Sequence, residues 1–239
     1  PLASRRKGPA TVAKGEFREN FNVFTEGLLQ GLNWDNVFLA GGAVLAAVHP
    51  VPEKYGATRQ GKRQYYHHDA YTASDIDLFL YGLDEAQANE KLKEVYFTIC
   101  DTFPDPSVQP LCFRTRHAVT IVSKFPYRHV QVILRIYKSP AEVLAGFDVD
   151  SCSIGFDGTN VWMTPRCHSS IVAKYNTVDM TRRSPTYEVR LAKYASRGVE
   201  VHIPVLDREH VDPQIYEIPF EKTNGLAKLL LLEKLNTPE

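Results

Sequence analysis

The sequence predicts an α/β (α+β) fold in which helices pack on a mixed sheet. Two observations favour this class: segments with helical apolar spacing alternate with short β-rich runs, and glycine or proline separates many of them. The chain has 239 residues, of which 44% are hydrophobic and 11% aromatic. It can therefore bury a substantial core, as one large domain or two small ones.

The first predicted elements are a helix, a strand and a second helix. From about Glu16 to Gly31, apolar residues recur on one helical face, namely Phe17, Phe21, Phe24 and Leu28. Residues 37–40 are a short apolar strand that leads through Gly41-Gly42 into a helix over residues 43–48. The predicted order is therefore strand, glycine turn, helix.

A break and a second strand come next. Residues 50–73 contain proline, glycine, cations and aromatic residues without a regular period, and we expect a long connection or lid there. Residues 74–81 are β-rich and alternate at their start, which predicts a strand with Asp75, Asp77 and Phe79 on one side. Two carboxylates then project from the same face.

The middle of the chain predicts a helix, a hairpin and a short helix. Asp84 is a suitable N-cap for a helix that ends before Pro104. Two β-rich runs, at residues 118–123 and 129–137, are spaced as a hairpin. A short helix over residues 139–146 is expected to follow.

The C-terminal part predicts further sheet and helix. Asp157-Gly158, between residues 152–157 and 160–164, is the strongest hairpin signal in the chain. Ser184-Pro185 offers an N-cap and a proline at the first helical position, and Gly198 lies just past the end of that helix. The remaining predicted elements are a strand over residues 199–205 and a helix over residues 226–235.

These elements suggest three parts of the chain. Residues 1–14 are expected to be a flexible lead-in, residues 15–138 a core, and residues 139–239 a C-terminal α+β region packed on that core. Because the sequence begins at Pro1 and not at methionine, we expect other domains of a longer chain as neighbours.

Charge and cysteine content limit the partners and the compartment. Lys plus Arg and Asp plus Glu both number 28, so no overall field draws the protein toward nucleic acid or a membrane. The four cysteines form no CxxC pair, which disfavours a disulfide framework and a cysteine-rich zinc site. No apolar run approaches the roughly 20 residues of a membrane span, and residues 1–15 lack a secretory signal. We therefore expect an intracellular protein, cytoplasmic or nuclear, without a membrane partner.

The pair Asp75 and Asp77 is suited to a metal ion. Side chains at i and i+2 on a strand share a face, with Cβ atoms roughly 6 to 7 Å apart. Mg²⁺ prefers oxygen ligands and commonly uses one or two carboxylates together with substrate phosphates. The pair therefore predicts a site for Mg²⁺, or Mn²⁺, that carries a nucleoside triphosphate.

The Gly41-Gly42 turn supplies a complementary phosphate site. Glycines at a helix start let phosphate approach backbone N–H groups and the positive end of the helix dipole. Taken alone, Gly-Gly is also an ordinary turn, and Asp-x-Asp is also a solvated strand end or a cap. Their order along the chain makes the combination more informative than either part.

In this order the motifs resemble the polymerase-beta-like nucleotidyltransferase superfamily. The matching segments are LAGG (residues 39–42) and SDIDLFLYG (residues 74–82), and the resemblance covers residues 37 to about 137. It implies transfer of a nucleoside monophosphate from a nucleoside triphosphate to a hydroxyl of RNA, protein or a small molecule. It also implies Asp75 and Asp77 as catalytic metal ligands, with Gly41, Gly42 and Ser74 at the nucleotide.

The third carboxylate of that family is not evident. The strand that should supply it, over residues 129–137, has Gln131 at the expected position, and a neutral amide is a poor substitute for an anion. Asp148 or Asp150, in a second Asp-x-Asp, could fold back and complete the set; the alternative is that both cap a turn. Without either, the protein would be an inactive binding module for nucleotide, nucleic acid or a partner protein, a pseudoenzyme.

Cations on the predicted C-terminal helix are further nucleotide-binding candidates. Arg190, Lys193 and Arg197 have the spacing of one helical stripe that could contact phosphates; the alternative is a solvated face. Other chemical clusters are better explained as surface loop or apolar packing; they are Lys62-Arg63 with Tyr65, Tyr66 and His67, the run His67-His68-Asp69, and Cys167-His168 with Cys152.

Overall fold

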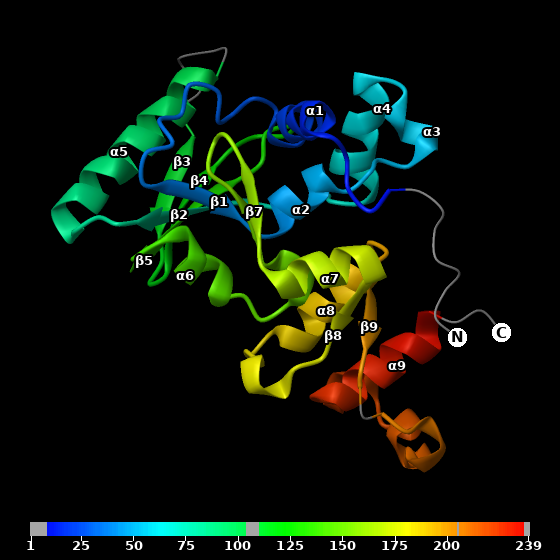
Figure 1. Ribbon diagram of the computed structural model, residues 1–239. Coiled ribbons are helices and arrows are strands. Elements are labelled where there is room, and N and C mark those ends of the chain that lie inside the picture. The colour runs from blue at the N-terminus through cyan, green and yellow to red at the C-terminus, as the bar shows by residue number, and fades with distance from the viewer. Residues whose placement is uncertain (1–8, 104–109, 205, 237–239) are drawn as a thin grey trace.

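The molecule is built around one large mixed sheet. The computed structural model describes residues 9–103, 110–204 and 206–236 (Figure 1). Seven strands lie in the order β3-β4-β5-β2-β1-β6-β7, with β2 and β5 parallel and the other neighbours antiparallel. A second sheet pairs β8 and β9 in parallel. The α/β class with a mixed sheet is therefore confirmed.

The strands are short, as their apolar runs predict. The large sheet contains β1 (Val37–Ala40), β2 (Ile76–Tyr81), β3 (Leu111–Arg114), β4 (Ala118–Val122), β5 (Val130–Tyr137), β6 (Ile154–Phe156) and β7 (Val161–Met163). The small sheet contains β8 (Tyr175–Thr177) and β9 (Glu200–His202). Because β6 and β7 continue the large sheet, that sheet extends beyond residue 138; where a folding unit ends stays a prediction.

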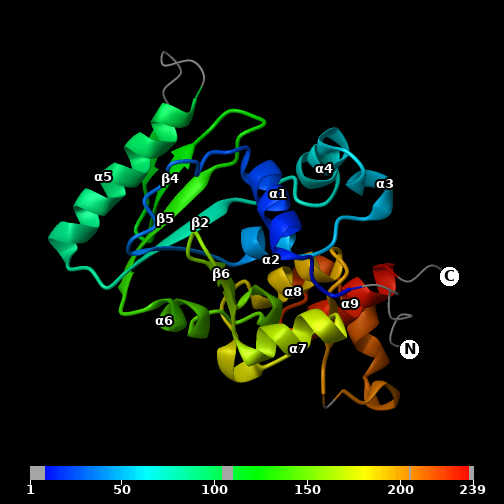
Figure 2. The same cartoon turned by 45° about the horizontal axis from the view of Figure 1, so that its top comes forward.

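Helices cover both faces of the large sheet. The longer ones are α1 (Lys14–Thr25), α2 (Gly42–Val48), α5 (Glu85–Thr102), α7 (Pro165–Ala173), α8 (Tyr187–Ala195) and α9 (Leu226–Asn236). Short helices are α3 (Glu53–Gly56), α4 (Arg59–Gln64) and α6 (Pro140–Ala145). Figure 2 shows α5 lying along β4 and β5, while α7, α8 and α9 form a separate layer near the end of α2. None of the described helices is long and apolar enough to span a membrane.

Two apolar clusters fill the space between these layers. The larger cluster joins one face of the sheet to α1, α2, α5 and the C-terminal helices. The smaller cluster lies on the opposite face, where Phe38, Ala40 and Phe79 pack against Val143 and Leu144 of α6. That second face also carries the side chains of Asp75 and Asp77, since residues two apart on a strand share a face.

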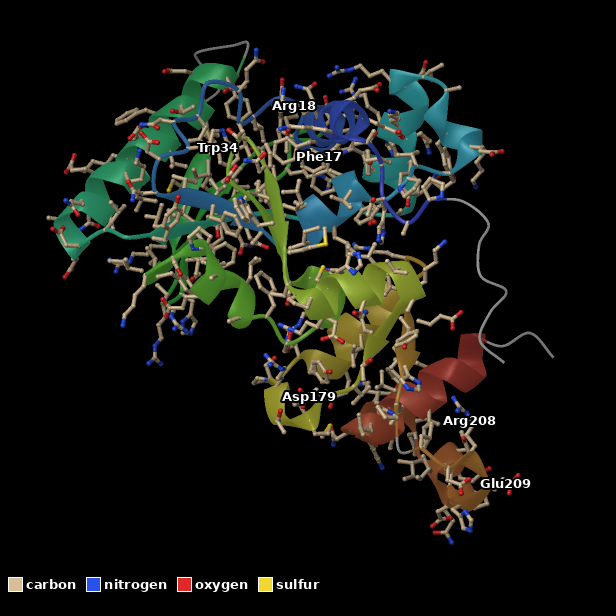
Figure 3. The ribbon with its side chains drawn as sticks, viewed as in Figure 1. Phe17, Arg18, Trp34, Asp179, Arg208 and Glu209 are labelled. Carbon is tan, nitrogen blue, oxygen red and sulfur yellow. The ribbon has the colours of Figure 1, made fainter. Side chains whose placement is uncertain are left out.

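Aromatic contacts fasten β6 to the N-terminal segment. The ring of Phe156 lies 5.2 Å from that of Phe17 on α1 and 5.3 Å from that of Trp34 before β1, centroid to centroid. Figure 3 labels Phe17 and Trp34 on the upper part of the molecule, far from Asp179, Arg208 and Glu209 at the other end. The hairpin predicted at Asp157-Gly158 is confirmed as β6 and β7.

Two expectations about helices were wrong. Residues 50–73 are not an irregular connection: they hold α3, α4 and a π-helix (Tyr65–Asp69), with Tyr66 and Tyr71 fully buried. The helix expected from Ser184-Pro185 begins at Tyr187 instead. The physical reason is that Arg190 takes the hydroxyls of Ser184 and Thr186 as acceptors, so the Ser184 hydroxyl is not the N-cap.

Other boundaries are close to those expected. Asp84 caps α5 through a complete capping box, and α5 ends at Thr102; Pro104 lies outside the described residues. In the predicted lead-in, residues 1–8 lie outside the described residues, Val12 donates to the Val48 carbonyl, and Lys14 already begins α1. The sequence patterns missed β3, α7 and β8.

A buried arginine holds the segment that leads into β2. Arg128 is 5% exposed, and its guanidinium donates to the backbone carbonyls of Phe24, Tyr66, Tyr71 and Ser74 at 2.7 to 2.9 Å. It also stacks 3.9 Å from the centre of the Phe24 ring. One side chain thus joins the end of α1, the π-helix and the residue just before Asp75.

Candidate functional site

The glycine turn lies beside the acidic strand. In the antiparallel pair of β1 and β2, Leu39 is opposite Leu78, so the end of β1 adjoins the start of β2 where Asp77 lies. Gly41 donates from its backbone nitrogen to the Ile154 carbonyl at 2.8 Å. The two predicted motifs are therefore neighbours where the end of β1 meets the start of β2, two central strands of the sheet.

Gly41 has a backbone that favours glycine. Its φ of +91° lies in a region that L side chains rarely adopt. A Cβ at Gly41 would meet the Phe147 ring at 3.1 Å, and one at Gly42 would meet the Tyr194 hydroxyl at 2.8 Å. Residues from the C-terminal half therefore lie directly against the turn.

The two carboxylates carry negative charge in a half-buried place. Burial raises the pKa of Asp77 to about 6, the charge of Asp75 adds to that rise, and Lys193 opposes it. Burial likewise raises the pKa of Asp75, against the opposing charges of His129, Lys193 and Arg128. In the described part of the chain, no Lys, Arg or His forms an ion pair with either acid.

Gln131 occupies the neighbouring position on β5. It is the register partner of Asp77 in the parallel pair of β2 and β5. Its Nε2 donates to Asp75 Oδ2 at 3.0 Å. An amide therefore lies beside the acid pair, where the family resemblance implied a third carboxylate.

Asp148 and Asp150 are held by other partners. Arg190 donates to Asp148, while Asp150 accepts from Arg166 Nη1 at 3.0 Å and from the Thr177 backbone N–H at 3.1 Å. Among the residues that the structure describes, no three His, Cys, Asp or Glu side chains gather as a metal site. Neither acid thus joins Asp75 and Asp77 in such a group.

The predicted cationic stripe divides into separate roles. Arg190 binds Asp148, Ser184 and Thr186. Arg197 donates to the Ala70 carbonyl at 3.1 Å and to Ser74 Oγ at 2.9 Å, so the buried Ser74 hydroxyl already has a partner.

Lys193 is the member of the stripe that faces the acids. Its surface stays largely exposed, its Nζ lies 5.6 Å from the centre of the Tyr194 ring, and its charge lowers the pKa of both Asp77 and Asp75. Partial burial and the charge of Arg197 lower the pKa of Lys193, and Cys152, Asp77 and Asp75 act in the opposite direction. This cation is not fixed in an ion pair within the described chain.

The remaining clusters are structural in this arrangement. His67 is buried, with Nε2 2.9 Å from Glu26 Oε1, and Tyr66 is fully buried rather than presented to a base. Burial raises the pKa of Cys152 to about 11 and that of Cys167 to about 12, which disfavours thiolates.

Tyr194 and Phe147 were missed as neighbours of the glycine turn. Their residue types mark them only as apolar residues, Tyr194 within the predicted C-terminal helix and Phe147 directly before the second Asp-x-Asp. No spacing in the sequence links position 42 to position 194. Their contact depends on how α8 packs against α2, which is tertiary information.

The fold and site define a mixed α/β protein with paired carboxylates beside a glycine turn. The chain belongs to the Gabija anti-defense 2 (Gad2) family, whose family model matches residues 15–174. It is 33% identical over 245 residues to the uncharacterized protein R883 of Acanthamoeba polyphaga mimivirus, in an alignment that covers 92% of this chain and 49% of that protein. The chain therefore spans about half the length of that relative.

Similarity to solved structures is also found. The CCA-adding enzyme of Bacillus stearothermophilus, in complex with CTP, aligns with 93% of this chain and 49% of its own, at 15% identity and a TM-score of 0.38.

Proposed function

We propose that this chain is a Mg²⁺-dependent nucleotidyltransferase that moves a nucleoside monophosphate from a nucleoside triphosphate to a hydroxyl acceptor. The observation that carries the proposal is the neighbourhood of Asp75 and Asp77 with the Gly41-Gly42 turn. Carboxylates bind the cation of the nucleotide, and a turn without side chains admits its phosphates.

The acid pair fits a divalent cation. Burial, and then the charge of Asp75, raise the pKa of Asp77, and no ion pair within the described residues neutralises the two carboxylates. Mg²⁺ or Mn²⁺ would be held by Asp75 and Asp77 together with phosphate oxygens. When bound, the cation neutralises charge on the triphosphate and on the departing pyrophosphate.

The protein's own residues orient the reacting groups. Gly41 forms the turn, with its own N–H bonded to the Ile154 carbonyl, and Gly42 at the start of α2 presents backbone to the triphosphate. Lys193 adds a positive charge from α8. The acceptor oxygen forms a bond to the α-phosphorus, the bond from that phosphorus to the bridging oxygen breaks, and pyrophosphate leaves. The hydroxyl proton passes to a carboxylate oxygen of Asp77.

The family description gives the reaction a context. A Gabija anti-defense protein acts against a defence system. We propose that the acceptor belongs to the cell under attack and is a protein, an RNA or a small molecule.

Label transfer tests this function. The protein is incubated with Mg²⁺ and each α-³²P-labelled nucleoside triphosphate, together with protein, RNA and small-molecule fractions of cells that carry a Gabija system. We expect labelled acceptor and released pyrophosphate with the natural chain and with Asp101→Asn, an exposed acid on α5, but not with Asp77→Asn. Equal labelling by Asp77→Asn would refute the proposal.

Gln131 favours a second candidate function, an inactive module that binds nucleotide without turnover. The amide next to Asp77 is neutral and is already hydrogen-bonded to Asp75. Calorimetry with Mg²⁺ and α,β-methylene-ATP distinguishes the two functions when set beside the labelling assay. Binding without labelled product favours the module, and product excludes it.

A further inference from the structure

The number of oxygen ligands at the acid pair limits how many cations it can hold. Asp75 and Asp77 offer four carboxylate oxygens, and Asp75 Oδ2 already accepts a hydrogen bond from Gln131 Nε2. One octahedral Mg²⁺ is served by one or two carboxylates and phosphate oxygens. A second cation would have no carboxylate of its own.

Gln131 contributes a neutral amide and not a carboxylate. Its register position opposite Asp77 puts it next to the pair, and its NH₂ group is directed at Asp75. Its amide oxygen is a neutral ligand, so this side chain brings no negative charge to hold a second cation. The position that could bridge two metal ions is therefore occupied by a group that stabilises the carboxylate directly.

The two acids of the second Asp-x-Asp already have partners. Asp148 is paired with Arg190, and Asp150 is held by Arg166 and by the backbone N–H of Thr177. Freeing either acid would leave a partly buried arginine without its partner, which is costly.

Lys193 supplies a positive charge that, unlike a metal ion, needs no coordinating oxygen atoms. It lies on α8, directly before Tyr194, whose hydroxyl contacts the glycine turn at Gly42. The Lys193 ammonium lies 5.6 Å from the centre of the Tyr194 ring, which places it near the glycine turn. An ammonium there can meet triphosphate oxygens without sharing Asp75 or Asp77.

Building on the proposed function, we infer that the site takes one divalent cation together with its nucleotide, and that Lys193 provides the positive charge that a second cation would otherwise bring. The site is thus a one-metal site with a lysine in support. Its net charge still suits a triphosphate, because one divalent cation balances the two carboxylates and Lys193 remains in excess.

Equilibrium dialysis of the full chain with Mn²⁺ and α,β-methylene-ATP tests this stoichiometry. The concentrations of Mn²⁺ and of nucleotide on the protein side, less those on the other side of the membrane, each give the number bound per chain. We expect one Mn²⁺ and one nucleotide per chain, and two Mn²⁺ per chain for Gln131→Asp or Gln131→Glu. Two Mn²⁺ in the natural chain would overturn the inference and leave the proposed function standing; no bound nucleotide would refute the proposed function.

The role of Lys193 is measured in the same experiment. Lys193→Met is expected to weaken nucleotide binding about tenfold while the Mn²⁺ count stays at one. Lys93→Met on α5 is the matched control, since Lys93 is 63% exposed and pairs with Glu90 on the same helix, and it should change neither value. Unchanged nucleotide affinity in Lys193→Met, or one Mn²⁺ in both folded Gln131 variants, would contradict the assignment.

Discussion

At the scale of single residues, burial and the neighbouring charge of Asp75 make the ionised form of Asp77 unfavourable. The pKa of Asp77 in the folded protein is about 6, above its ordinary value of 3.8. The folded state therefore binds the proton more tightly than the unfolded state, and stability falls as pH rises from about 4 through 6. Without metal, the carboxylates destabilise the fold at neutral pH.

Asp77→Asn should consequently stabilise the metal-free protein at pH 7.5. We expect a gain of about 1 to 2 kcal/mol that disappears below about pH 4, because a protonated Asp and an Asn carry the same charge. Thermal unfolding in EDTA across this pH range measures it, with Asp101→Asn as the control. A gain that is as large at pH 4 as at pH 7.5 would contradict this account.

The raised pKa of Asp77 also makes metal binding pH-dependent. A divalent cation requires the deprotonated Asp77, so the rise in melting temperature caused by Mn²⁺ should be large at pH 7.5 and small at pH 5. Differential scanning fluorimetry at both pH values measures the shift. An equal shift at both pH values would show that Asp77 is not a ligand.

Gly42 is small because Tyr194 lies against it. A methyl group at Gly42 would lie 2.8 Å from the Tyr194 hydroxyl but 3.9 Å from the ring carbon that bears it. Gly42→Ala should therefore cost about 1 to 3 kcal/mol in the natural background and clearly less in Tyr194→Phe. A double-mutant cycle by urea unfolding checks this, and zero coupling would contradict the contact.

At the scale of elements, Arg128 connects α1, the π-helix and β2. Arg128→Met would leave four carbonyls without their donor, and we expect a loss of about 3 to 5 kcal/mol. Urea unfolding measures the loss. Arg135→Met is the control: Arg135 is 64% exposed in its pair with Glu142, and it should cost under about 1 kcal/mol. Similar costs for both variants would disprove the role of Arg128.

Local signals predicted the elements whose cause is local. The capping box at Asp84, the turn at Asp157-Gly158 and the strand that leads into Gly41 depend on neighbouring residues, and all three are present. The strand β3 has every residue exposed, so it shows no alternation of burial. The helices within residues 50–73 owe their packing to buried tyrosines and Arg128, which a local period does not reveal.

The candidate site was predictable only in part. Asp75, Asp77, Gly41 and Gly42 stood out by residue type and order, and Gln131 by its place in a predicted strand. The ion pairs that hold Asp148 and Asp150, and the approach of Lys193 and Tyr194, join segments far apart in the chain. Whether these residues act in catalysis or binding stays a prediction.

At the scale of the whole molecule, the principal core is continuous. One cluster of buried residues runs from Phe17 on α1 through Val44 on α2 to Leu191 on α8 and Leu229 on α9. A shared core couples the stability of all these elements.

Unfolding should therefore be a single transition. Leu191 is fully buried, so Leu191→Ala should destabilise the fold. We expect the midpoint of unfolding to fall by the same amount whether far-UV circular dichroism or tryptophan fluorescence is followed. Both tryptophans, Trp34 and Trp162, lie outside α8, so their fluorescence reports on a different part of the molecule. A shift in only one signal would indicate two independent units.

The meeting of Gly42 and Tyr194 also constrains how such chains diverge. The two positions are 152 residues apart and belong to different layers, yet position 42 has room for a side chain only if the residue at position 194 is smaller. Lineages that acquire a side chain at position 42 should therefore carry a smaller residue at position 194, so that a substitution on α2 is matched by one on α8.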